Sequence, residues 1–168
     1  MEYTFTLKYQ LADQAPSADV LVERLATAGC EDALIGLGIP GRMALEFIRE
    51  APSAGQAMES ALQQINTVMP AARLFEVSPD YVGLTDVADL IGMTRQNMRK
   101  LMLTHYLTFP PPVHEGAATI WHLAEVLTWL SQRGGYCVPG HIQETAAAAL
   151  KLNLSKAITR HHSPPDTP

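Results

Sequence analysis

Side chains that can recognise nucleic acid are concentrated in one short stretch of this chain: Thr94, Arg95, Gln96, Asn97, Arg99 and Lys100. Arginine and glutamine form two-pronged hydrogen bonds with the edges of guanine and adenine, so we expect the two arginines and the glutamine to contact bases. Lysine carries a compact charge that suits a phosphate oxygen, and hydroxyl and amide groups also bind phosphate. We therefore expect Thr94, Asn97 and Lys100 to contact or orient toward the phosphate backbone.

The residues around this stretch predict two short helices joined by a tight turn. Thr85 can cap the first helix, which carries apolar residues at helical spacing: Val87, Ala88, Leu90 and Ile91. Gly92 can end that helix, because glycine tolerates the left-handed conformation found after helices. Thr94 can then cap the second helix, in which Met98 and Leu101 face inward and leave the polar residues outside.

A proline-rich stretch and another helical pattern follow this helix pair. Residues 109–113 have the sequence Phe-Pro-Pro-Pro-Val, Gly116 predicts a turn, and residues 119–130 follow with many apolar side chains. Trp121 and Trp129 belong to that last pattern. We expect them to hold the preceding segment to the core rather than to stack on bases.

Residues 82–133, about a third of the chain, resemble the winged helix-turn-helix proteins of bacteria and phages of the excisionase, AlpA and MerR-like type. The resemblance includes the small Ala88 where the helices would cross, Gly92 at the turn, and the inward Met98 and Leu101. It implies sequence-specific binding of double-stranded DNA by a bacterial or prophage transcription regulator or by an excisionase-like factor.

The same resemblance implies that residues 114–118 form the tip of a wing near the minor groove, with His114 as a DNA-binding residue. Proteins of this type are expected to have a basic wing. This wing has Glu115 and no Lys or Arg. The sequence therefore departs from the pattern at the wing contact.

The chain is acidic, and its charge is unevenly distributed. Its 168 residues hold 12 Lys and Arg against 17 Asp and Glu, a formal net charge of −5, which argues against nonspecific coating of nucleic acid. Residues 1–78 carry five basic against ten acidic residues, whereas residues 79–133 carry four against five. So few basic residues imply few phosphate contacts per subunit, and we expect a homodimer.

The first 78 residues show the patterns of a small α+β domain. Residues 3–11 alternate apolar and polar side chains, as a half-buried strand does. The next patterns predict a helix, two strands around a turn, a helix and a strand: residues 17–29, 33–37, 42–49, 53–70 and 72–77. This order is that of the ferredoxin-like fold, an antiparallel sheet with both helices on one face.

We expect four segments in an α+β chain. Residues 1–78 would form the ferredoxin-like domain, for dimerisation or sensing, and residues 79–135 the winged helix-turn-helix domain. Residues 136–160 would form a C-terminal helix and residues 161–168 a disordered tail. Between the first two segments, residues 78–80 predict a short polar joint.

The predicted C-terminal helix carries one apolar stripe: Leu150, Leu154 and Ile158. Small Ala146 and Ala147 lie one turn earlier. Small residues along an apolar stripe suit close packing, either on the core or on another subunit.

Other patterns argue against an enzyme, a cofactor and a metal site. Residues 36–41 contain three glycines but lack the strand-to-helix transition and the Lys-Ser or Lys-Thr pair of a phosphate-binding loop, so they predict a turn. The six histidines lack ligand spacing. We find no serine in a strand-turn-helix elbow and no carboxylate pair with an evident partner, and therefore expect no catalysis.

Two further features bear on location and on the competing functional class. Cys30 and Cys137 are far apart and predict reduced thiols, and no apolar run approaches the ~20 residues that cross a bilayer. We therefore expect a soluble cytoplasmic protein without membrane contact. The competing class is a protein-interaction or ligand-sensing module, in which the acidic N-terminal domain binds an unidentified small molecule or protein and the helix-turn-helix docks a protein partner.

Overall fold

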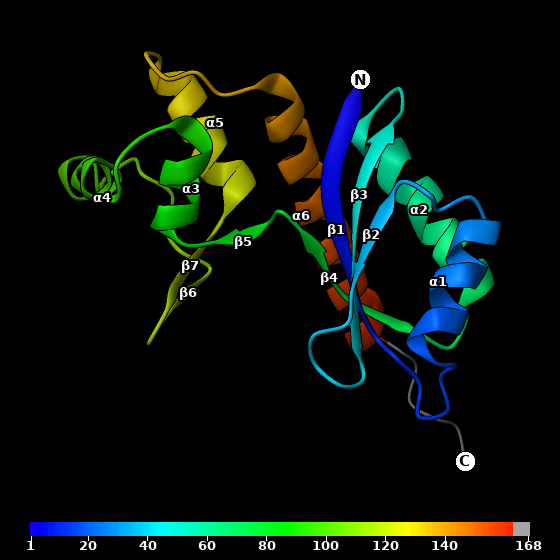
Figure 1. Cartoon of the computed structure of the whole chain (residues 1–168). Helices are drawn as coiled ribbons and strands as arrows, with labels where there is room; N and C mark the ends of the chain where they lie inside the picture. Colours follow the sequence, from blue (N-terminus) through cyan, green and yellow to red (C-terminus); the bar gives the residue numbers. More distant parts are fainter. Residues whose placement is uncertain (163–168) are drawn as a thin grey trace. The chain divides into compact units, whose positions relative to one another are not determined.

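The computed structural model describes residues 1–162 and has mixed α+β structure with antiparallel sheets and a C-terminal helix (Figure 1). The chain divides into two compact units. The first contains Met1–Ser78 and the residues from Ala148 onward, and the second is Pro79–Ala147. Of residues 161–168, expected to be a disordered tail, His161 belongs to the C-terminal helix, and residues 163–168 lie outside the described residues.

The first unit is built on one four-stranded sheet. Its elements up to Ser78 have the order expected from the sequence: β1 (Glu2–Gln10), α1 (Ala18–Thr27), β2 (Ala33–Gly36), β3 (Arg42–Glu50), α2 (Ala54–Val68) and β4 (Arg73–Ser78). The strand order is β2-β3-β1-β4, and each neighbouring pair is antiparallel. Residues 37–41 form the β2–β3 connection, as predicted, whereas Gly36 is the last residue of β2; Gly41 has a φ of 79°.

The core of this unit lies between one face of the sheet and the helices α1 and α2, which lie on the same side (Figure 1). Strict alternation buries every second side chain of β1: Tyr3, Phe5, Leu7 and Tyr9. The Phe5 and Phe47 rings stack with centroids 5.3 Å apart. Leu21 and Leu25 of α1 and Ile65 of α2 close this core.

Arg49 is buried on the same strand face because it continues the alternation of β3. Its guanidinium donates to both carboxylate oxygens of Asp32, at 2.7 and 2.8 Å, and to Ser60 Oγ at 3.1 Å. It also lies 4.9 Å above the Phe47 ring. The hydrogen bond from Arg49 holds the pKa of Asp32 below its ordinary value.

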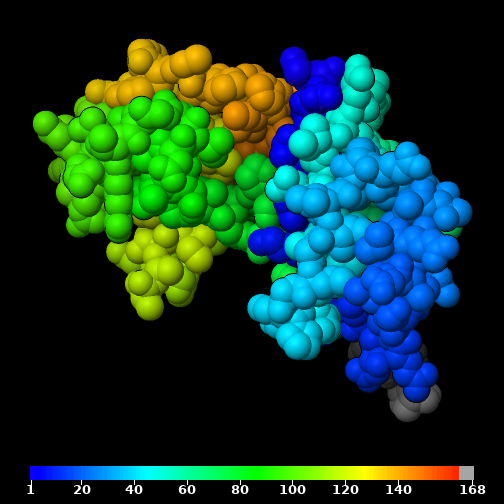
Figure 2. Space-filling view, in the orientation of Figure 1, coloured from blue at the N-terminus to red at the C-terminus, as the bar shows by residue number. Residues whose placement is uncertain are grey.

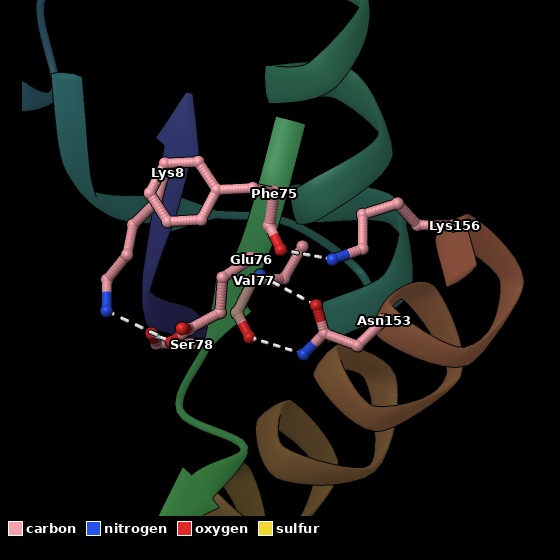
Figure 3. A network of polar contacts seen from close by, with 7 residues as sticks. All are labelled: Lys8, Phe75, Glu76, Val77, Ser78, Asn153 and Lys156. Atoms are coloured by element: carbon pink, nitrogen blue, oxygen red, sulfur yellow. Dashed lines mark hydrogen bonds and ion pairs between the residues drawn. The ribbon is translucent and has the colours of Figure 1, made fainter. Parts of the chain in front are cut away.

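The C-terminal helix α6 (Gly140–His161) is shared by the two units. In the first unit, Ala149 joins the core and the Asn153 side chain bonds the backbone of Val77 in β4 (Figure 3). Leu154 and Ile158 are 48% and 59% exposed, so the predicted apolar stripe does not cover the core there. The small Ala149 and the hydrogen-bonding Asn153 provide the closely packed face instead.

The second unit combines a three-stranded sheet with short helices. Its elements before α6 are β5 (Tyr81–Val82), α3 (Leu84–Ile91), α4 (Arg95–Thr104), β6 (His114–Glu115), β7 (Thr119–His122) and α5 (Leu123–Arg133). The sheet order is β5-β7-β6, and both pairings are antiparallel. Among the helices that the structure describes, none has the length and apolar character required to cross a membrane.

Two tryptophans fix the segment between α4 and β6. Trp121 Nε1 donates to the Pro110 carbonyl at 3.1 Å, and Trp129 Nε1 donates to Thr108 Oγ1 at 3.2 Å. The Phe109 ring makes an edge contact with each of them, at centroid distances of 6.4 Å to Trp121 and 5.0 Å to Trp129. Both tryptophans thus hold residues 108–110, which precede the predicted wing.

Candidate nucleic-acid interface

The first helix of the predicted pair begins two residues earlier than a Thr85 cap would require. Gly83 occupies the N-cap position of α3, and Asp86 Oδ2 accepts a hydrogen bond from the Gly83 N–H at 2.9 Å. Thr85 therefore lies inside the first turn, and its predicted capping function is wrong. The Asp86 carboxylate supplies the stabilisation at the helix start instead.

The turn between α3 and α4 has the predicted geometry. Gly92 is left-handed, with φ 74° and ψ 29°, and the Met93 N–H donates to the Ala88 carbonyl at 2.9 Å. Thr94 is the N-cap of α4, and its Oγ1 accepts from the Asn97 N–H at 3.1 Å. The cap uses Oγ1 as an acceptor, so the Thr94 hydroxyl hydrogen can still be donated to a phosphate.

Helix α4 has one face in the core and a polar face outside. Met98 is fully buried, and Leu101 and Met102 pack beside it. The six residues expected to bind nucleic acid are all exposed: Thr94, Arg95, Gln96, Asn97, Arg99 and Lys100. Within residues 1–162, the three cations of this set form no ion pair. Their charges are therefore not neutralised by any described carboxylate.

The exposed residues of α4 occupy two sides of the helix. Arg95 and Arg99 are four residues apart and share one side. Asn97, Lys100 and Thr104 are three and four residues apart and share another, where they line a shallow groove of about 430 Å³. Gln96 is four residues before Lys100 and three before Arg99, so it lies between the two sides.

The groove adds Thr104 and Tyr136, which sequence reasoning did not identify. His105 and Tyr136 line it together with Lys100, and Tyr136 comes from the connection between α5 and α6. The His105 ring packs 5.9 Å from the Trp129 ring, and Arg133 Nη1 lies 3.4 Å from His105 Nδ1. Thr104 could have been found from its helical spacing after Lys100, but nothing in the sequence pattern brings Tyr136 to α4.

The predicted wing is the hairpin of β6 and β7 (Figures 1 and 2). His114 pairs with Ile120, and both His114 and Glu115 are exposed. The His114 ring lies over Gly116, where an added Cβ would come within 2.7 Å of Nε2. His114 is thus at the surface of the hairpin but on a different element from the α4 residues.

A buried pair at the start of the second unit was also missed. Asp80 is fully buried, and its Oδ1 lies 2.6 Å from His122 Nδ1. The Asp80 carbonyl accepts from the Leu123 N–H at 2.7 Å, at the start of α5. A residue predicted to be part of a polar joint therefore fixes β5 to the β7–α5 junction.

Within residues 1–162, no three His, Cys, Asp or Glu side chains form a group that could hold a metal ion. Comparisons with protein-family models, with curated proteins and with solved structures found no match for this chain.

Proposed function

We propose that this protein binds double-stranded DNA through α4, as a prokaryotic or prophage transcription regulator or an excisionase-like factor. The observation that carries the proposal is the polar face of α4, on which Arg95, Arg99 and Lys100 are exposed and make no ion pair with any described residue. A helix capped by Thr94 and anchored by Met98 holds these charges on a rigid element. The function requires no catalysis or cofactor and places the protein in the cytoplasm.

We further propose that the second unit is a winged helix-turn-helix and the first a ferredoxin-like domain. The left-handed Gly92 between α3 and α4 and the β6–β7 hairpin support the first assignment. The strand order β2-β3-β1-β4, with α1 and α2 on one face, supports the second. A homodimer then supplies two copies of α4 for two half-sites.

The proposed division of contacts assigns Arg95 and Arg99 to one side of α4 and Lys100 and Asn97 to the other, with Gln96 between them. Arg95, Gln96 and Arg99 contact base edges in the major groove, while Lys100 and Asn97 contact phosphate together with the groove residues Thr104 and Tyr136. His114 is the wing contact. Because Glu115 is exposed beside it and residues 113–122 contain no Lys or Arg, the wing contributes little electrostatic attraction.

Selection of bound duplexes from a random pool tests the proposal. The wild-type protein is expected to enrich a defined site, and the double variant Arg95→Ala/Arg99→Ala to lose that enrichment with an unchanged circular dichroism spectrum. The matched control is Arg24→Ala/Arg73→Ala, which removes two exposed arginines from the first unit. Equal affinity of both double variants for the selected site would contradict the assignment of α4.

An exposed apolar surface after α4 favours the competing function, docking of a protein partner. Leu103, Tyr106 and Leu107 are 56%, 73% and 84% exposed, and they follow one another at the end of α4 and in the next turn. Exposed apolar groups of this kind mark protein contacts. If the purified protein binds no duplex at low salt, even from a randomised pool, this alternative replaces DNA binding.

A further inference from the structure

The two edges of the four-stranded sheet differ in what covers them. At the β4 edge, side chains of α6 take up backbone groups: Asn153 bonds Val77, and Lys156 donates to the Phe75 carbonyl (Figure 3). At the opposite edge, no strand of residues 1–162 pairs with the outer side of β2. An uncovered strand edge presents N–H and C=O groups that can pair with another chain.

The hydrogen bonds of β2 show which groups point outward. The Ile48 N–H donates to the Asp32 carbonyl, so residues at even positions of β2 direct their backbone groups toward β3. The N–H and C=O of Ile35 therefore point away from β3. Ala33 also faces away from β3, but its N–H already donates to the Cys30 carbonyl at 3.3 Å. Ile35 is therefore the position of β2 whose N–H and C=O both point to the open edge.

This edge lacks two of the features that usually prevent pairing, although the strand itself has only four residues. Its sequence, Ala-Leu-Ile-Gly, contains no charge and no proline. Leu34 is 73% exposed on the outer face of the sheet, and light-blue atoms of this part of the chain lie at the surface in Figure 2. Ile48 on the neighbouring strand is 53% exposed.

We propose that β2 pairs with β2 of a second copy of this chain, antiparallel and with the two-fold axis at Ile35. The inference deepens the homodimer part of the proposed function and rests on it. In this register the two Ile35 residues exchange both backbone hydrogen bonds, and Leu34 lies opposite Gly36 of the second copy. The two sheets become one continuous sheet of eight strands.

Self-complementarity identifies the occupant as a second copy. Gly36 has no side chain, so it leaves room for the exposed Leu34 of the other chain, and symmetry makes this contact twice. The acidic Glu31 and Asp32 fall opposite residues 38 and 39 of the second copy, Gly and Ile, so no like charges face each other.

Disulfide cross-linking without DNA tests the register. In a Cys137→Ser background, one preparation carries Leu34→Cys and another Gly36→Cys; a Cβ at Gly36 is tolerated, since its nearest contact is the Ala44 carbonyl at 3.9 Å. Residues opposite each other at a non-hydrogen-bonded position are close enough for a disulfide. A cross-linked dimer is expected from the mixture and not from Leu34→Cys alone. No cross-link in the mixture, or an equal yield from Leu34→Cys alone, overturns the proposal.

Light scattering at micromolar concentration supplies the second measurement. The wild-type protein is expected as a dimer, at twice the chain mass of 18.3 kDa. Leu34→Lys is expected as a monomer, at the mass of a single chain, with a native circular dichroism spectrum. The matched control, Leu154→Lys, places the same charge on the exposed stripe of α6 and is expected to remain dimeric. A monomeric wild type, or dissociation by Leu154→Lys instead, rejects the β2 interface. Because both measurements omit DNA, their failure is distinct from failure of the selection experiment.

Discussion

The side-chain amide of Asn153 bonds both backbone groups of Val77: its Nδ2 donates to the Val77 carbonyl at 2.8 Å, and its Oδ1 accepts from the Val77 N–H at 2.8 Å (Figure 3). A single amide thus makes the two hydrogen bonds that a neighbouring strand would make. Both residues are buried. Helix α6 therefore closes the β4 edge by specific hydrogen bonding and not by apolar contact alone.

Replacing Asn153 should destabilise the first unit strongly. Asn153→Ala leaves a buried N–H and a buried C=O without partners, each of which costs about 1–3 kcal/mol, so we expect a loss of about 2–4 kcal/mol in the free energy of unfolding. Urea denaturation followed by circular dichroism measures this loss. Leu154→Ala, at the neighbouring exposed position, should cost less than about 1 kcal/mol. Equal costs at the two positions would contradict the proposed closure of the edge.

The Asp80–His122 pair should stabilise the second unit in a comparable way. Asp80→Ala removes the buried carboxylate that contacts His122 Nδ1 at 2.6 Å. Because His122 Nδ1 then lacks this partner, we expect the free energy of unfolding to fall by about 2–4 kcal/mol. Asp89→Ala, which removes an exposed carboxylate of α3, should change stability by less than about 0.5 kcal/mol. Thermal unfolding distinguishes the two variants. Similar melting temperatures would show that the pair does not hold the β7–α5 junction.

Local patterns were sufficient to predict most elements of the chain. The alternation from Tyr3 to Tyr9 identified both the strand and its buried face, because a period of two has one physical interpretation. Gly92 and Thr94 marked the turn correctly, since each has a backbone or capping property that few residues share. The buried Met98 and exposed Lys100 then followed from helical spacing.

The errors arose where the deciding partner is distant or where two local candidates compete. Asp80 was expected in a polar joint because its partner, His122, is 42 residues away. Periodicity found the apolar Leu154 but gave no sign that Asn153 would bond Val77. At α3, Thr85 was expected as the cap, but the Asp86 side chain accepts from the Gly83 N–H and the helix starts after Gly83 instead.

The ion pair of Asp32 and Arg49 should make the free energy of unfolding depend on pH in the acidic range. Because the Arg49 hydrogen bond lowers the pKa of folded Asp32, the pair contributes stability above the ordinary Asp pKa of about 4 and loses it as the pH falls through the lower folded value. The stability difference between wild type and Asp32→Asn should therefore shrink between pH 6 and pH 3. Urea titrations at both pH values measure it. A stability difference for Asp32→Asn that stays constant over this pH range would refute the prediction.

The two thiols should differ in reactivity. Cys30 is 3% exposed, and burial raises the pKa of its thiol, so little reactive thiolate is available to a reagent. Cys137 is exposed. We expect an aromatic disulfide reagent at pH 8 to modify Cys137 at least roughly tenfold faster than Cys30. Cys137→Ser should remove the fast phase, and its persistence would show that Cys30 is accessible.

Salt dependence provides the sharpest separation of the two functional classes, because each phosphate neutralised on duplex DNA contributes a slope of about −0.9 to log affinity against log salt. With Lys100, the arginines of α4 and the helix N-termini as contacts, a dimer should give a moderate slope of roughly −3 to −6. Lys100→Ala should weaken binding to all sequences alike and reduce the slope by about one per subunit.

Lys151→Ala removes the same charge at an exposed position of α6 and serves as the matched control for Lys100→Ala. It should leave both the affinity and the slope unchanged, because Lys151 lies on the first unit and outside the groove beside α4. If Lys100→Ala instead changes affinity for the selected site only, Lys100 contacts a base and the two sides of α4 must be reassigned. If both lysine variants reduce the slope equally, the attraction is a general charge effect and α4 is not the binding surface.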